Sequence, residues 1–81
     1  MKKSAKVTLY GTHICPWCEL ARVFLEHHHI PFEDIYVDSD KKAAALMLKK
    51  TGQRHVPVIE VGKKIILGFD EDELRKVLRV R

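Results

Sequence analysis

KVTLYGTHICPWCELARVFLEHHHIPFEDIYV, residues 6–37, contains two β-prone runs on either side of a helical pattern. We expect a strand from KVTLY at residues 6–10, which a glycine follows, and another from FEDIYV at residues 32–37. Between them, side chains recur at steps of three and four residues: Leu20, Ala21, Phe24, Leu25 and His28. This period predicts an amphipathic helix. A strand, a helix and a second strand predict a parallel crossover.

Both ends of this helix carry sequence signals. Pro16 fits the first turn, where the missing proline N–H is no loss. Ile30 precedes Pro31, and a residue before proline is pushed out of helical space, so the helix is expected to stop there. Cys15 therefore lies where the first strand ends and the helix begins.

Two further helices are predicted. Asp38-Ser39 offers an N-cap for the first of them, and Gly52 is placed to close it. One side of that helix is formed by Ala43, Leu46, Met47 and Lys50. The sequence Asp70-Glu71-Asp72-Glu73 is typical of a capping box at the start of the last helix. Phe69 and Leu74 stand at the positions of a hydrophobic staple.

A hairpin is expected between these helices. PVIEV at residues 57–61 and KIIL at residues 64–67 flank Gly62-Lys63, a two-residue loop with glycine first that suits a type II′ turn. The resulting order, β-α-β-α-β-β-α, predicts an α/β fold with a four-stranded mixed sheet flanked by helices. A single domain is expected over residues 1–81.

Composition narrows the class of protein. The chain is 46% hydrophobic and 32% charged, an ordinary balance for a folded domain. The net charge of +4 comes from dispersed basic residues rather than a basic stripe, so no nucleic-acid partner is predicted. No stretch is long and apolar enough for a leader or a membrane span. Two cysteines are too few for a disulfide scaffold, and we expect a cytoplasmic, monomeric protein.

The two cysteines, Cys15 and Cys18, point to redox chemistry. A cysteine at a helix N-terminus meets unpaired N–H groups and the positive end of the helix dipole, which favour its thiolate. The thiolate is the species that attacks a disulfide. Cys18 lies one helical turn further on, close enough to attack a mixed disulfide formed at Cys15. We therefore predict Cys15 as the nucleophile and Cys18 as the resolving thiol.

Other roles for the cysteines are weighed against this one. CxxC is half of a zinc site, but a second CxxC or a spaced His pair is missing. His27, His28 and His29 point about 100° apart while helical, so they do not converge on one ion. No metal ligand is therefore predicted, although a zinc ion or cluster shared between the CPWC sites of two chains stays open. Two buried structural cysteines are a further alternative.

TLYGTHICPWCELARVFLEHHHIPFEDIYVD, followed by TGQRHVPVIEVGKKIILGFD, resembles the glutaredoxin-type members of the thioredoxin superfamily. The resemblance runs from about Lys6 to Leu78 and rests on CPWC, on the VP dipeptide some forty residues later and on GFD before the last helix. It implies a thioredoxin-like fold and a thiol–disulfide oxidoreductase. It also implies that Pro57 is cis and faces the active site, with Val56 presenting its backbone to a substrate chain.

The resemblance also assigns candidate contacts for the substrate or glutathione. They are Thr12, His13, Trp17, Gln53, Arg54, His55, Val56, Pro57, Gly68, Phe69 and Asp70. Three features depart from the glutathione-using pattern. No Lys or Arg stands shortly before Cys15, His55 replaces the usual Thr before Val-Pro, and Leu67-Gly68-Phe69-Asp70 replaces the GGCD motif. Gly68 and Asp70 survive, and Gln53 or Arg54 is placed to meet a carboxylate.

The GFD ending also resembles the NrdH-type redoxins, which are similar to glutaredoxins but are reduced by thioredoxin reductase. The expected electron source is therefore either glutathione or thioredoxin reductase with NADPH. No tightly bound cofactor is expected, and the expected partners are disulfide-containing proteins.

Residues near the sulfurs carry expectations of their own. Trp17 is predicted to be exposed on the docking surface. His13 and His55, if protonated, would favour the Cys15 thiolate; the alternative is that both are solvated loop residues. Arg22 lies on the helical face of Cys18 and is placed to bias the thiols, but we expect it to face solvent and pair with Glu19 or Glu26.

Overall fold

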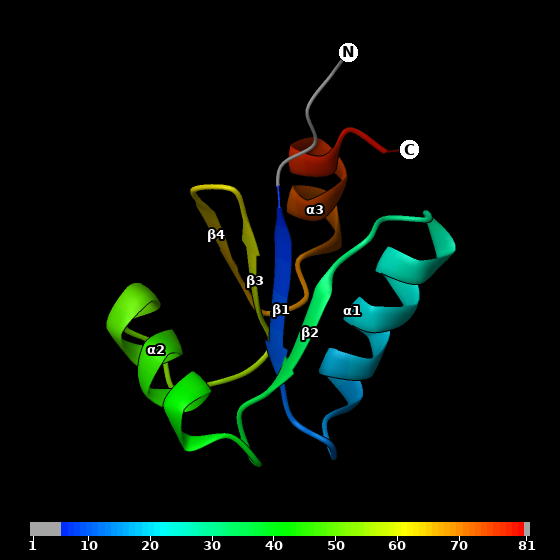
Figure 1. Cartoon of the computed structure of the whole chain (residues 1–81). Coiled ribbons are helices and arrows are strands. Elements are labelled where there is room, and N and C mark those ends of the chain that lie inside the picture. Colours follow the sequence, from blue (N-terminus) through cyan, green and yellow to red (C-terminus); the bar gives the residue numbers. More distant parts are fainter. Residues whose placement is uncertain (1–5, 81) are drawn as a thin grey trace.

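The computed structural model describes residues 6–80; residues 1–5, which hold the basic start of the chain, and residue 81 lie outside the described part. Its elements follow the predicted order (Figure 1): β1 (Val7–Gly11), α1 (Pro16–His27), β2 (Glu33–Tyr36), α2 (Lys41–Thr51), β3 (Val58–Val61), β4 (Lys64–Leu67) and α3 (Glu71–Leu78). Among residues 6–80, no helix has the length and apolar character needed to cross a membrane.

The predicted mixed sheet is confirmed. Its strand order is β2-β1-β3-β4. β1 and β2 are parallel, whereas β1 pairs with β3, and β3 with β4, in antiparallel fashion. Tyr10 of β1 lies opposite Ile35 of β2 and Val58 of β3. The register with β3 therefore places Pro57, the residue before β3, beside Gly11 at the end of β1.

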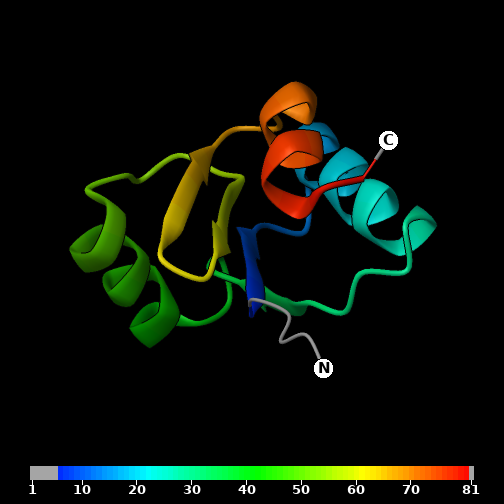
Figure 2. The same cartoon turned by 90° about the horizontal axis from the view of Figure 1, so that it is seen from above.

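Helices cover both faces of the sheet (Figure 2). α1 and α3 lie on one face and α2 lies on the other. The core of the α1 and α3 side is formed around Leu9, Leu25, Ile59 and Leu74. A smaller cluster beneath α2 contains Tyr10, Met47 and Val58. Alternate residues of β1 and β3 enter opposite clusters, as the pleat of a strand requires.

The predicted buried face of α1 is confirmed at Ala21, Phe24 and Leu25 but not at Leu20. Leu20 is 46% exposed, whereas Cys18 and Ala21 are fully buried and Arg22 is 6% exposed. Steps of 100° per residue place Cys18, Ala21 and Arg22 around one side of the helix and Leu20 well away from it. The prediction followed apolar character, and the packed helix also turns a cysteine and an arginine inward.

The end of α1 is set by the backbone before Pro31 is reached. The amide of Ile30 donates to the Leu25 carbonyl at 2.9 Å, and the amide of His29 donates to the Glu26 carbonyl at 3.0 Å. These are the two bonds of a Schellman motif, in which the residue after the cap is left-handed. His29 occupies that position with φ 57°. The helix therefore ends at His27 rather than at Ile30.

The start of α2 corrects a second prediction. Asp40, not Asp38 or Ser39, is the N-cap, and its carboxylate accepts a hydrogen bond from the Ala43 amide at 3.1 Å. The two expected caps have other partners. Asp38 accepts from His13, and the Ser39 hydroxyl donates to the Tyr36 carbonyl.

The two glycine positions and the Asp70 cap are confirmed, whereas the capping box of α3 is formed only in part. Gly52 closes α2 with φ 71°, and Gly62 opens the two-residue β3–β4 loop with φ 61°. Asp70 caps α3 by accepting from the Glu73 amide at 3.2 Å. The reciprocal bond of a full capping box is not formed within residues 6–80; the Glu73 carboxylate lies 3.9 Å from the Lys64 ammonium.

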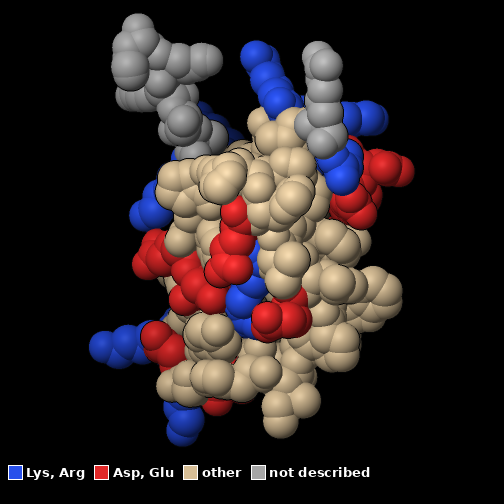
Figure 3. All heavy atoms as spheres, turned by 90° about the vertical axis from the view of Figure 1, so that its right-hand side faces the viewer, with Lys and Arg blue, Asp and Glu red and all other residues tan. Residues whose placement is uncertain are grey.

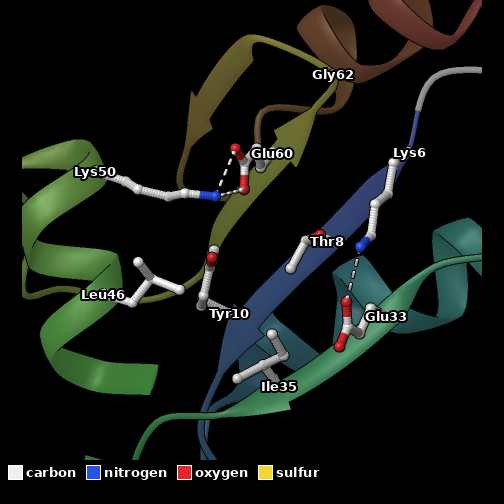
Figure 4. A pocket seen from close by; sticks show the side chains of 9 residues that line it. All are labelled: Lys6, Thr8, Tyr10, Glu33, Ile35, Leu46, Lys50, Glu60 and Gly62. Carbon is white, nitrogen blue, oxygen red and sulfur yellow. Dashed lines mark hydrogen bonds and ion pairs between the residues drawn. The ribbon is translucent and has the colours of Figure 1, made fainter. Parts of the chain in front are cut away.

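A groove of about 260 Å³ opens on the α2 side of the sheet (Figure 4). Its lining residues are Lys6, Thr8, Tyr10, Glu33, Ile35, Leu46, Lys50, Glu60 and Gly62. Both lysines are already neutralised: Lys50 lies 3.2 Å from Glu60, and Lys6 lies 3.5 Å from Glu33. The cysteines belong to α1 on the other face, so the groove is separate from them.

We predict that His29→Gly raises the free energy of unfolding by about 1 kcal/mol. The left-handed conformation costs an L-residue about 1–2 kcal/mol, and the greater freedom of glycine in the unfolded chain offsets part of that gain. Urea unfolding measures the change as a higher midpoint at an unaltered slope.

Gly52→Ala is the mirror-image control, because Gly52 is also left-handed and an added Cβ meets no atom within 4 Å. Any loss of stability in this variant is therefore conformational. A destabilised His29→Gly protein would contradict the assignment of the Schellman end.

Candidate active site

Cys15 is the N-cap of α1, as predicted from its place before Pro16. Its backbone is extended, with φ −156° and ψ 102°, and its sulfur accepts a hydrogen bond from the Cys18 amide at 3.2 Å. The two cysteines form a disulfide with a Cα–Cα distance of 5.2 Å. The structure therefore shows the oxidised form of a close CPWC pair.

The two sulfurs differ in exposure. Cys15 is partly exposed, whereas Cys18 is 0% exposed. In the reduced protein, the Cys18 amide and the α1 N-terminus would favour a negative charge on Cys15. An accessible thiol that is stabilised as a thiolate suits an attacking group. A buried neighbour one turn away suits the group that attacks second.

The segment before β3 lies at the same end of the sheet as this pair. The Val56–Pro57 peptide bond is cis, as the resemblance implied, and Pro57 is buried. The Pro57 carbonyl accepts from the Gly68 amide at 2.8 Å. The sheet register brings Pro57 beside Gly11. Pro57 and Gly68 therefore lie at the end of the sheet from which the chain continues to the cysteines.

Other candidate contacts lie along the same two segments. The backbone N–H of Gln53 donates a hydrogen bond to the Thr51 hydroxyl at 3.1 Å. Arg54 and His55 are exposed, and their side chains make no hydrogen bond or ion pair within residues 6–80. Phe69 packs against the core of the α1 and α3 side, and the Asp70 carboxylate caps α3.

His13 is held by a carboxylate. Its amide donates to Asp38 at 3.1 Å, and its Nδ1 lies 3.0 Å from the same carboxylate. Its ring also stacks on Tyr36 with 4.2 Å between centroids. The backbone hydrogen bond from His13, followed by the side-chain bond, lowers the pKa of Asp38. A protonated His13 would therefore have its charge balanced by Asp38.

Arg22 is the residue that the sequence interpretation placed incorrectly. It does not face solvent: only 6% of it is exposed. Its expected pairing with Glu19 is confirmed at 3.2 Å, but its shorter ion pair, at 3.0 Å, is with Asp34 of β2. The one sequence signal for this position was its four-residue step from Cys18, which puts both residues on the buried face of α1.

The surface around Cys15 is apolar. Trp17 is 60% exposed, as predicted, and Ile14 is 93% exposed. Leu20 and Val23 extend the exposed apolar residues along α1. The side of the molecule that carries α1 shows a broad area without charged side chains beside a group of acidic and basic ones (Figure 3). This surface suits contact with another polypeptide more than with a small charged ligand.

Within residues 6–80, no group of three His, Cys, Asp or Glu side chains is arranged to hold a metal ion. A four-stranded mixed sheet flanked by helices, with a CPWC pair at the start of α1 and a cis-proline at the same end of the sheet, defines a thioredoxin-superfamily protein with a redox-active cysteine pair.

Comparison with known proteins identifies the family within that superfamily. The glutaredoxin family model matches residues 7–66, and the chain belongs to this family. A glutaredoxin-like 8.6 kDa protein from the rubredoxin operon of Clostridium pasteurianum is 35% identical over 72 residues, which span 89% of this chain and 96% of that protein.

Two solved structures extend the comparison. The glutaredoxin of Archaeoglobus fulgidus has a TM-score of 0.84 and 32% identity, covering 93% of this chain and 87% of its own. The glutaredoxin-like NrdH-redoxin of Escherichia coli has a TM-score of 0.77 and 30% identity, covering 88% of this chain and 92% of its own.

We predict that Asp38→Asn makes the protein less stable above about pH 4 and that the difference disappears in acid. The pKa of Asp38 is lowered in the folded state, so its contribution is complete above the unfolded value of about 3.9 and is lost as pH falls through the folded value. Urea unfolding of both proteins at a series of pH values tests this. A difference that stays constant from pH 2 to 7 would show that the carboxylate charge is irrelevant.

Proposed function

We propose that the protein is a dithiol thiol–disulfide oxidoreductase that reduces protein disulfides or mixed disulfides with glutathione. The observation that carries the proposal is the asymmetry of the CPWC pair. Cys15 is partly exposed, and its sulfur accepts a hydrogen bond from the Cys18 amide at 3.2 Å, while Cys18 is buried one turn away. Its membership of the glutaredoxin family supports the same chemistry. The reducing cytoplasm is the compartment that suits such a pair.

The reaction proceeds in two exchanges. The Cys15 thiolate attacks one sulfur of the substrate disulfide, that bond breaks, and the other substrate sulfur leaves as a thiolate. The Cys18 thiolate then attacks the Cys15 sulfur of the mixed disulfide and releases the second substrate sulfur. Two electrons have passed to the substrate, and the protein holds the Cys15–Cys18 disulfide until an electron donor reduces it.

The substrate would lie across the exposed groups around Cys15. Val56, before the cis-proline, offers its backbone to an extended substrate chain. Trp17 and Ile14 offer apolar contact area next to the sulfur. Gln53, Arg54 and Asp70 are the candidates for holding the charged ends of glutathione.

Reduction by a thioredoxin reductase is the second candidate. The region before Cys15 supplies no Lys or Arg for a glutathione carboxylate, and the Asp70 carboxylate already caps α3. The structural neighbour NrdH-redoxin is described as having a thioredoxin-like activity profile. The apolar surface around Trp17 fits a protein donor at least as well as a tripeptide.

Cys15→Ser is expected to reduce disulfide reductase activity to background, because the attacking thiolate is removed. Reduction of insulin or of a small disulfide in the presence of dithiothreitol measures this. Cys18→Ser is expected to retain the first exchange and accumulate mixed disulfides, which intact mass spectrometry detects. Near-wild-type activity of Cys15→Ser would overturn the proposed function, and the lack of any adduct with Cys18→Ser would overturn the resolving role.

The electron donor can be identified from the fluorescence of Trp17, the single tryptophan, which lies between the two cysteines. The oxidised protein is mixed either with glutathione, glutathione reductase and NADPH, or with thioredoxin reductase and NADPH. A fast fluorescence change with glutathione would establish a glutathione-dependent enzyme. A change only with thioredoxin reductase would establish the second candidate.

A further inference from the structure

The resolving step of the proposed reaction meets an electrostatic difficulty at Cys18. This sulfur is 0% exposed, and burial disfavours the ionised form of a thiol. Only the thiolate attacks a disulfide, so a neutral Cys18 would resolve slowly. The helix N-terminus helps Cys15 directly, whereas Cys18 lies one turn further into α1. Some other group must therefore stabilise negative charge on Cys18.

Arg22 supplies a positive charge beside Cys18. A Cβ placed on Gly11 would lie 3.0 Å from Arg22 Nη2 and 3.1 Å from Cys18 Sγ. Because the two atoms lie 3.0 and 3.1 Å from one point, they are at most 6.1 Å apart. Gly11 contributes no side chain between them. A cation and a sulfur separated by so little buried space interact strongly.

The partners of Arg22 fix which part of the guanidinium faces Cys18. Nε binds the Asp34 carboxylate at 3.0 and 3.1 Å, and Nη1 binds Glu19 at 3.2 Å. Nη2 donates to the Thr12 carbonyl at 3.2 Å and lies against Gly11. The two carboxylates therefore occupy the other nitrogens, and the positive Nη2 end is left toward the sulfur.

Asp34 and Glu19 offset part of the charge of Arg22, and the other charged pair near its guanidinium is His13 with Asp38. The guanidinium lies 4.5 Å from the Tyr36 ring centroid, and His13 stacks on the same ring while paired with Asp38. β1 contributes the uncharged Gly11. Burial acts to lower the pKa of Arg22, but Asp34, Tyr36 and Glu19 together raise it, so Arg22 stays charged.

We propose that Arg22 is a positioning residue for the resolving step, favouring the thiolate of Cys18, and that Asp34 moderates its charge. The inference rests on the proposed function, in which Cys18 attacks the mixed disulfide at Cys15. In that step Arg22 exchanges no proton. It stabilises the charge that Cys18 carries before the attack. The Thr12 contact also holds the loop that leads to Cys15.

The proposal predicts opposite effects for the two partners of the ion pair. In a Cys15→Ser background, Cys18 is the single thiol, and its thiolate is titrated by absorbance near 240 nm. Arg22→Met should raise the apparent pKa of Cys18 by about one unit or more, which is a tenfold loss of thiolate at a fixed pH below that value. Asp34→Asn should lower it, and Arg22→Lys should fall between Arg22→Met and the parent.

Arg75→Met is the matched control. Arg75 also pairs with a carboxylate, that of Glu71, and lies over an aromatic ring, that of Phe24. It is on α3 and not beside Gly11, so the Cys18 titration should not move. Circular dichroism shows which variants are folded. If Arg22→Met does not fold, the opposite shifts of Asp34→Asn and Arg22→Lys still decide the matter.

An unchanged Cys18 titration in folded Arg22 variants would overturn the proposal, and so would shifts in the same direction for Arg22→Met and Asp34→Asn. Neither result involves oxidoreductase activity. Failure of this inference is therefore distinct from failure of the proposed function, which the activity of Cys15→Ser decides.

Discussion

The close approach of α1 to β1 at Gly11 is the contact on which the rest of the site depends. Any Cβ at this position would be about 3.0 Å from Arg22 and 3.1 Å from Cys18, tighter than ordinary packing. With glycine there, the first turns of the helix lie directly on the strand. Cys18 is buried as a result, while Cys15, at the end of the helix, stays partly exposed.

The same contact extends into β2 and the loop after it. Buried beside Gly11, Arg22 reaches Asp34 on β2 and the Thr12 carbonyl. The guanidinium of Arg22 and the ring of His13 both pack against the ring of Tyr36. His13 in turn pairs with Asp38, and Asp40 caps α2. The loop before Cys15 is therefore tied to the residues that lead into α2.

Features that depend on residues close together in the chain could be predicted from the sequence. The element order, the mixed sheet, the Gly52 and Asp70 caps and the CPWC position all rest on residues close together in the chain. Arg22 and Asp38 were placed incorrectly because their partners are distant: Asp34 is 12 residues from Arg22, and His13 is 25 residues from Asp38. Hydrophobic periodicity also favours Leu20 over Arg22 as a buried residue, since it takes no account of an ion pair that compensates a buried charge.

The two sulfurs thus depend on different kinds of information. Cys15 lies at the start of a helix, a position that favours a thiolate and that the motif itself encodes. The environment of Cys18 depends on Gly11, Arg22 and Asp34, which the motif does not contain. Trp17, Arg54 and His55 form a third set, and all three are exposed. The motif therefore accounts for the position of Cys15, whereas the burial and charge around Cys18 come from residues outside it.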